Sequence, residues 1–347
     1  MSAPDAASGL QAAPEGGAVA RPLAPAQPWR ARARAGLTAL IIAGFLLVPV
    51  YARVADDSYA LILFGRILVF ALAALGLNLA LGFGGMVSLG HAMYIGLGAY
   101  CVGILSFFGV HSGWLHLLAV LVVSGLIALP VGWIALRTHG IAFIMITLAL
   151  AQLFYFVFVS LKQFGGDDGL KLAQPSDFGP LTGNDTALYL ATLACVLAAA
   201  YGLSRVVASR FGLVLRATRT GERRVNSVGT PSLPYRLAAY VLSAELCGLA
   251  GYFLANLTGF VSPAYMAWSV SGELVVMVLL GGIGTVFGPV VGVSALLLLE
   301  EFLKAYTDHW ALVLGPLIVL IVVFLRRGLW GMLQARREAT TTWGGHG

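Results

Sequence analysis

Residues 81–100 read LGFGGMVSLGHAMYIGLGAY and lie within a long apolar part of the chain. They include one histidine, His91, and six glycines, although a glycine inside a helix costs about 1 kcal/mol relative to alanine. Non-helical backbone at membrane depth is tolerated only where it is buried in protein or lines a cavity. The stretch therefore leaves two alternatives open, tight helix packing beside a loop or a broken helix that lines a translocation pathway. The glycines are Gly82, Gly84, Gly85, Gly90, Gly96 and Gly98.

The whole chain is too poor in charge for a soluble domain. It has 347 residues, of which 59% are hydrophobic and only 10% charged, whereas soluble domains carry about 25% charged residues. The mean hydropathy is +0.89, and many apolar runs approach the roughly 20 residues that a membrane-spanning helix needs. We therefore expect an all-α fold, a polytopic transmembrane helical bundle. The runs are long and continuous, unlike the short alternating strands of a membrane β-barrel.

Ten candidate spans follow from these runs. We expect a transmembrane domain over 35–330, a disordered tail over 1–34 and a short C-terminal tail over 331–347. The pair 269–303 is too long for one span, and the sequence GGIGTVFGP at 281–289 interrupts it. The ten spans are 36–52, 59–82, 91–109, 115–136, 141–161, 187–206, 235–258, 269–284, 287–303 and 310–325.

The charge distribution supports this count. If the N-terminus is cytoplasmic, the inner segments hold 16 Lys and Arg and 4 Asp and Glu. The outer loops hold 4 Lys and Arg and 9 Asp and Glu. Cytoplasmic loops are enriched in Lys and Arg, so both termini are expected in the cytoplasm. The net charge of +6 is then explained without nucleic acid. The inner segments are 1–35, 137–140, 205–236 and 326–347, and the outer loops are 53–58, 110–114, 162–186, 259–268 and 300–309.

Four polar residues in the apolar segments are candidates for the translocation pathway, namely Asn78, Ser88, His91 and Glu245. An ionisable side chain inside a membrane is expensive and suggests a function. A structural hydrogen bond to a neighbouring helix is the alternative for each of them, and we favour it for His91 and Glu245. Arg66 and Glu273 lie nearer the outer ends of their spans, where long side chains reach the membrane surface.

A second glycine cluster has a composition similar to that of residues 81–100. It reads GGIGTVFGPVVG at 281–292 and includes Gly281 and Gly282. Gly284, Gly288 and Gly292 recur at every fourth residue, which predicts one closely packed helix face. Pro289 cannot donate a backbone hydrogen bond, so we expect a break beside this face. Paired interruptions in two halves are common in transporters.

No motif in the sequence indicates chemistry on a substrate. The three cysteines form no CxxC pair, so no metal site is expected. GxSxG, HExxH and GxxxxGK[ST] are all absent from the sequence, and without the last motif a chain does not hydrolyse ATP in the P-loop manner. We therefore expect a transport subunit that is not an enzyme and binds no cofactor, and any ATP and Mg²⁺ would be bound by partner subunits.

Four ordered motifs resemble the permeases of branched-chain amino acid ABC transporters, specifically the LivM-like branch. They are LGLNLALGFGGMVSLGHAMYIGLGAY (75–100), GGDDGL (165–170), YRLAAYVLSAELCGLAGYFLANLTGFVSP (235–263) and SGELVVMVLLGGIGTVFGPVVG (271–292). The resemblance covers roughly residues 36–330. It implies a bacterial inner-membrane importer with a second, homologous permease, two cytoplasmic P-loop ATPase subunits and an external solute-binding protein.

The resemblance also implies a coupling role for the inner loop 207–234. In such permeases a short amphipathic helix docks into an ATPase groove, and here that helix falls on RATRTGERRVNSVG at 216–229. Arg219, Glu222 and Gly229 match the family pattern, Arg223 adds charge, and Val225 replaces the usual small residue. A basic loop that only fixes topology is the alternative.

Three other functions stay open at this stage. Urea, short amides or aromatic acids are alternative substrates within the same family. An ion-coupled secondary transporter that uses Glu245 or His91 is an alternative from a different functional class. A membrane-embedded enzyme is the third alternative, but the sequence offers no paired catalytic residues for it.

The outer acidic residues Asp167 and Asp168 are expected to help dock a binding protein through complementary charge.

Overall fold

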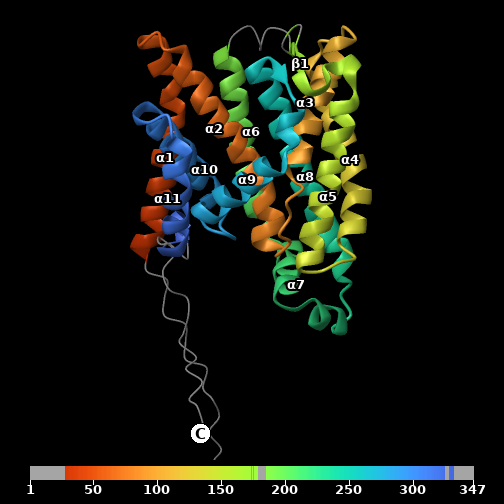
Figure 1. Cartoon of the computed structure of the whole chain (residues 1–347). Helices are drawn as coiled ribbons and strands as arrows, with labels where there is room; N and C mark the ends of the chain where they lie inside the picture. Colours follow the sequence, from red (N-terminus) through yellow and green to blue (C-terminus); the bar gives the residue numbers. More distant parts are fainter. Residues whose placement is uncertain (1–27, 173, 175, 179–184, 325–327, 332–347) are drawn as a thin grey trace, which may run out of the picture.

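The computed structural model describes residues 28–172, 174, 176–178, 185–324 and 328–331, and these residues are predominantly helical. The long helices run roughly side by side in a bundle (Figure 1). The helices of the first half are α1 (Pro28–Val54), α2 (Ser58–Asn78), α3 (Ala92–Phe107), α4 (Gly113–Ala135) and α5 (Ile141–Ser160). Those of the second half are α6 (Asp185–Ala208), α7 (Arg210–Ser227), α8 (Ser232–Thr258), α9 (Trp268–Gly281), α10 (Gly288–Tyr306), α11 (Trp310–Phe324) and α12 (Gly328–Gly331).

Each of the ten expected apolar segments coincides largely with a helix, but the count of ten spans is not confirmed. By length and composition, six helices of the described chain are suited to cross a membrane, and three apolar helices are shorter. The remaining expected segment, 287–303, coincides with α10, whose end carries Glu300, Glu301 and Lys304. The six long segments are Gly36–Val54, Tyr59–Phe83, Gly113–Ala135, Ile141–Ser160, Asp185–Ala208 and Ser232–Thr258.

The tails expected from the sequence lie mostly outside the described residues. Residues 1–27 and 332–347 are not described. The expected disorder of the N-terminal tail therefore stays a prediction, and so does the expected C-terminal tail. The first helix already begins at Pro28, before the expected domain boundary at residue 35. Proline is well tolerated in the first turn of a helix, because its missing N–H would be unpaired there in any case.

The centre of the bundle is formed by α8, with α2 and α3 each packed on it. About 78% of the apolar window of α2 is buried, against 17% for α1 and α5. Small residues bring α3 and α8 close together, since a Cβ at Gly98 would lie 2.0 Å from the carbonyl oxygen of Gly248. The peripheral helices therefore surround a core whose helices approach backbone to backbone.

A small cap of loops covers one end of the bundle. Its two-stranded antiparallel sheet joins β1 (Leu170–Lys171) to β2 (Phe260–Val261), and short helical turns η2 (Lys162–Phe164), η3 (Gly166–Asp168) and η5 (Pro263–Met266) flank it. Helix α7 lies at the opposite end (Figure 1). The connection 137–140 lies at the α7 end too, because His139 contacts Glu222 of α7. This arrangement agrees with the expectation that 137–140 and 207–234 share one side of the membrane.

Candidate functional site

The first glycine cluster is a genuine break between α2 and α3. After Asn78 the backbone forms a five-residue π-helix, η1 (Leu79–Phe83), and then an irregular segment up to the start of α3 at Ala92. The freed backbone groups are partly satisfied locally, as in the bond from the Met86 amide to the Ala80 carbonyl of 2.9 Å. Gly85 adopts a φ of 68°, which residues with a Cβ rarely adopt. The interruption expected between the spans that end at 82 and begin at 91 is therefore present, and a role in a translocation pathway stays a prediction.

The second glycine cluster breaks the chain between α9 and α10. Helix α9 ends at Gly281, and α10 begins at Gly288. The expected single helix face through Gly284, Gly288 and Gly292 is wrong for Gly284, which lies in the turn with a φ of 74°. Gly292 and Gly281 do mediate close packing, because a Cβ at Gly292 would lie 2.0 Å from the Met277 carbonyl oxygen and one at Gly281 would lie 1.9 Å from that of Gly288.

Asn78 joins the two breaks. Its amide nitrogen Nδ2 donates to the Thr285 carbonyl at 2.8 Å, and its Oδ1 accepts from the Gly284 amide at 3.0 Å. The side chain is only 1% exposed, so both bonds are shielded from solvent. A Cβ at Gly82 would lie 2.7 Å from the Gly284 nitrogen. Two segments about 200 residues apart in sequence therefore meet backbone to backbone, and glycine is required at the contact.

Helix α7 reaches this junction through Arg219. The Arg219 guanidinium donates a hydrogen bond from Nη1 to the Gly82 carbonyl oxygen. Its aliphatic stem lies over Gly85, where an added Cβ would come within 2.7 Å of the Arg219 Cγ. Leu215, one turn earlier on α7, is fully buried and faces Gly84, where a Cβ would lie 3.4 Å from its Cδ1. Arg219 thus points into the chain's own helix break.

Glu222 ties α7 to the two neighbouring segments at the same end. Its Oε2 accepts from Arg236 Nη1 at 2.6 Å and from His139 Nε2 at 2.8 Å, and its Oε1 accepts from the Ser232 hydroxyl at 2.8 Å. Partial burial opposes ionisation, but the Ser232 hydrogen bond, the Arg236 charge and the His139 hydrogen bond together lower the pKa of Glu222 below its ordinary value. The carboxylate is therefore a charged anchor between α7, α8 and the 137–140 connection.

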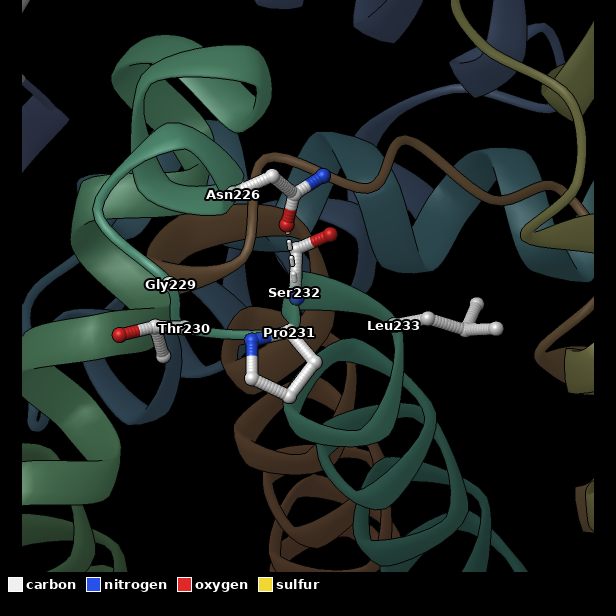
Figure 2. Close-up of a pocket in the computed structure, with 6 residues that line it drawn as sticks. All are labelled: Asn226, Gly229, Thr230, Pro231, Ser232 and Leu233. Carbon is white, nitrogen blue, oxygen red and sulfur yellow. Dashed lines mark hydrogen bonds between the residues drawn. The ribbon is translucent and has the colours of Figure 1, made fainter.

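The C-terminal part of α7 and the turn after it are left uncovered by the part of the chain that the structure describes. Arg223 and Gly229 are exposed, and the apolar side chain of Val228 is 84% exposed. Beside them lies a shallow hollow at the turn from α7 to α8 (Figure 2). The hollow is lined by Asn226, Gly229, Thr230, Pro231, Ser232 and Leu233.

His91 is completely buried and makes its hydrogen bond to α8. Its Nε2 lies 2.8 Å from the Ser243 hydroxyl oxygen, and that hydroxyl lies 2.6 Å from the Gly76 carbonyl oxygen. Because a carbonyl only accepts, the single Ser243 proton goes to Gly76, and His91 Nε2 must be the donor to Ser243. His91 Nδ1 then carries a lone pair with no partner among the described residues. This geometry assigns His91 a neutral tautomer that ties α2, α3 and α8 together.

The other two pathway candidates lie apart from the junction of the breaks. Ser88 is buried, and its hydroxyl accepts from the Gly90 amide at 3.2 Å. Gly90 itself lies against α5, since a Cβ there would be 2.7 Å from the Thr147 carbonyl oxygen. Glu245 is half-buried between α8 and α4, where its Oε1 would lie 2.5 Å from a Cβ at Gly125. Its Oε2 has no hydrogen-bond partner among the described residues.

Comparison with known proteins places this architecture in a family. Residues 59–323 match the family described as the branched-chain amino acid transport system permease component. The chain belongs to this family. The match covers both helix breaks, α7 and the central helices, which are the parts of the chain that form the candidate site.

The permease also resembles individual bacterial proteins across most of its length. It is 25% identical over 292 residues to the high-affinity branched-chain amino acid transport permease LivM of Salmonella typhimurium, covering 77% of this chain and 69% of that protein. It is 25% identical over 297 residues to LivM of Escherichia coli, with the same coverage. It is 24% identical over 294 residues to LivH of Escherichia coli, covering 77% of this chain and 93% of LivH. No solved structure matches significantly.

Several partners in this permease were not singled out by the sequence reasoning. Ser243 and Tyr240 flank His91, and their spacing of three residues on α8 places them on one helix face. Thr285 lies inside the second glycine cluster but contributes its backbone carbonyl, which no side-chain motif reveals. Arg236 lies near the start of α8, where only the three-dimensional approach of Glu222 gives it a role.

Proposed function

We propose that this permease is the membrane-spanning subunit of an ATP-driven ABC importer for branched-chain or related amino acids in a bacterial inner membrane. The observation that carries the proposal is the placement of α7. This basic, amphipathic helix presents one face to the broken helices and leaves Arg223, Val228 and Gly229 exposed at its far end. Such a helix is suited to receive a force from another protein and deliver it to the pathway.

The partner complement follows from the family and from the absence of an ATPase motif in the sequence. We propose a second, homologous permease, two cytoplasmic P-loop ATPase subunits that supply ATP and Mg²⁺ binding, and an external solute-binding protein. The permease itself carries out no chemistry and binds no cofactor. Its termini and α7 lie in the cytoplasm, in agreement with the charge distribution.

The exposed end of α7 would form the ATPase contact. Val228 supplies an apolar side chain, Arg223 a positive charge, and the hollow over Gly229 and Ser232 a concave surface (Figure 2). An apolar centre with a charged rim is typical of a protein interface. Arg219 and Glu222, which the family pattern places in the same coupling segment, would act on the inner side of α7 by fixing it to the permease.

The glycine-rich breaks would then lie beside the translocation pathway. Asn78, Ser88, His91 and Glu245 stay candidates for that pathway, with hydrogen bonds to the permease's own backbone supporting a structural role for Asn78 and Ser88, and one to the Ser243 hydroxyl supporting it for His91. A zwitterion with an apolar side chain needs a route with few fixed charges, because each isolated charge at membrane depth is expensive. Alternating access would be switched by ATP binding and hydrolysis in the partner subunits.

The deciding experiment is co-purification of this chain from native membranes with identification of every bound subunit. Recovery of a second permease and two P-loop ATPases, with uptake in vesicles that requires internal ATP, is the expected result. Recovery of the chain alone, with uptake driven by a proton or sodium gradient, would overturn the proposal. Ligand binding to the associated solute-binding protein then distinguishes branched-chain amino acids from urea, amides or aromatic acids.

A further inference from the structure

The junction of the two helix breaks has more connections than packing alone requires. Asn78 on α2 bonds to two backbone groups of the second break, the Gly284 amide and the Thr285 carbonyl. The Gly82 carbonyl, left free by the first break, accepts from Arg219 on α7. Three elements far apart in sequence are therefore linked through two side chains and the irregular backbone between them.

Each link is specific to the broken conformation. In a regular helix the Gly82 carbonyl would accept from an amide one turn later, and no arginine would be needed. Because Arg219 takes the place of that amide, it recognises the break itself. Gly82 also leaves room for the Asn78 side chain, since a Cβ there would lie 2.1 Å from Asn78 Oδ1. The stem of Arg219 likewise occupies the space that a side chain at Gly85 would need.

The rest of α7 supports a rigid connection up to Arg219 and a bend after it. Gly212, Leu215 and Thr218 are buried along one face before Arg219. At Gly221 the backbone leaves helical geometry, with φ of −178° and ψ of 94°. The part of α7 that contacts the breaks is thus separated by a kink from the exposed end around Arg223 and Val228.

We infer that the first half of α7 and the two glycine-rich breaks move as one unit, with Arg219 and Asn78 as the positioning residues that join them. A displacement of α7 would then shift both breaks together and change the cytoplasmic side of the pathway in a single step. This inference rests on the proposed function, because it assigns the force on α7 to the ATPase subunits. It assigns two roles to different parts of α7. The exposed end binds the ATPase subunit, and Arg219 transmits the motion of α7 to the two breaks.

The first test uses the complete importer reconstituted in liposomes with loaded solute-binding protein. We expect Arg219→Gln to keep the ATPase subunits bound and to keep basal ATP hydrolysis, while uptake per ATP falls about 10-fold, as expected when a charged hydrogen bond is lost. Arg219→Lys should restore part of the uptake, because its ammonium also donates to a carbonyl. Arg216→Gln is the matched control, since the Arg216 side chain donates within α7, to the Gly212 carbonyl at 3.2 Å.

The outcomes distinguish this inference from the proposed function. Uptake by Arg219→Gln equal to that of Arg216→Gln would overturn the inference. Loss of the ATPase subunits from Arg219→Gln alone would also overturn it, because Arg219 would then be a docking contact. If even the unmodified chain binds no ATPase subunits, the proposed function fails as well.

The second test measures whether the unit is rigid. Spin labels at the exposed positions Val87 in the first break, Ile283 in the second and Ala217 on α7 report the three distances between them, in a variant without the native cysteines. In the unmodified complex we expect the same three distances in nucleotide-free and ATP-bound states. In Asn78→Leu the distance between labels 87 and 283 should broaden, and in Arg219→Gln the distances to label 217 should change. Distances that already change with nucleotide in the unmodified complex would overturn the inference.

Discussion

The Ser243 hydroxyl determines which nitrogen of His91 carries a proton. It has one proton and two neighbours, the Gly76 carbonyl and His91 Nε2, and the carbonyl must receive the proton. His91 is therefore a donor at Nε2, and protonation of Nδ1 would place a second N–H where none of the described residues accepts it. At the scale of a single residue, the intramembrane histidine serves as a link between helices.

Removal of the Ser243 hydroxyl should therefore destabilise the permease. In Ser243→Ala the buried His91 N–H and the Gly76 carbonyl both lose a partner, and we expect a loss of about 1–3 kcal/mol. The apparent unfolding temperature of the purified complex in detergent reports this loss. Ser294→Ala is the control, because that hydroxyl donates to the Val290 carbonyl in its own helix. Equal unfolding temperatures for the two variants would contradict the structural role of His91.

At the scale of the helices, α3 and α8 contact each other through backbone atoms at glycine positions. A Cβ at Gly251 would lie 1.9 Å from the Ile95 carbonyl oxygen, and one at Gly98 would lie 2.0 Å from that of Gly248. Real Cβ atoms do not approach other atoms this closely, so any larger residue must push the two helices apart. Glycine here has a packing role, unlike the conformational role of Gly85 and Gly284 in the breaks.

Alanine at Gly251 should consequently cost more than alanine elsewhere in the bundle. We expect Gly251→Ala to lose about 1–3 kcal/mol, because the added methyl overpacks the α3–α8 contact. Gly202→Ala on α6 is the control, since a Cβ there meets nothing within 4 Å; it should be neutral or stabilising by up to about 1 kcal/mol. The yield of folded complex and its unfolding temperature measure both effects. A neutral Gly251→Ala would show that the two helices are not in close contact.

The anchor between α7 and α8 should weaken in acid. The pKa of Glu222 is lowered in the folded protein, so its stabilisation is complete above the ordinary value of 4.5 and is lost as pH falls through the lower, folded value. We expect Glu222→Gln to be less stable than the unmodified permease at pH 7. The difference should shrink as the pH falls below about 4.5. Parallel profiles of unfolding temperature from pH 7 to pH 3 would refute this.

The positions of the elements followed from local sequence, but their contacts did not. Apolar runs of about 20 residues have few alternatives to a helix in lipid, and clusters such as 82–90 and 281–289 predict breaks for the same reason. The periodicity of Gly284, Gly288 and Gly292 misled because the chain leaves the helix at Gly282, where spacing no longer corresponds to a face. The link from Asn78 to Gly284 depends on the packing of α2 against α9 and α10, which no local pattern contains.

At the scale of the whole molecule, the two ends of the bundle are built differently. The α7 end is basic and is fixed by side chains, whereas the opposite end is a cap fixed mainly by backbone bonds. In that cap Leu170 pairs with Val261, and the Gly113 amide donates to the Asp177 carbonyl at 2.7 Å. Ser176 adds two further bonds, to Asn256 and to His116. The cap therefore holds the exposed Asp167 and Asp168 in a defined position.

A defined acidic surface at this end is suited to receive a solute-binding protein. Charges at the rim of an interface act mainly on association rate and on salt dependence. Reversal of both charges, Asp167→Lys with Asp168→Lys, should raise the half-saturating concentration of loaded binding protein roughly 5-fold at low salt, since two exposed pairs together contribute about 1 kcal/mol. Basal ATP hydrolysis should stay unchanged. The effect should shrink in 0.5 M salt, where exposed charges are screened within about 4 Å.

The turn between α10 and α11 offers a matched control, because Asp308 there is also exposed and lies outside the cap. Asp308→Lys changes the net charge by the same amount per site, so a general effect of charge on the membrane surface would appear in it as well. Uptake measured against binding-protein concentration separates the two cases. An equal shift in Asp308→Lys, or none in the double variant, would contradict docking at the cap. A shift confined to Asp167 and Asp168 would locate delivery of the substrate at the end opposite α7, so that solute and force enter this permease from opposite sides.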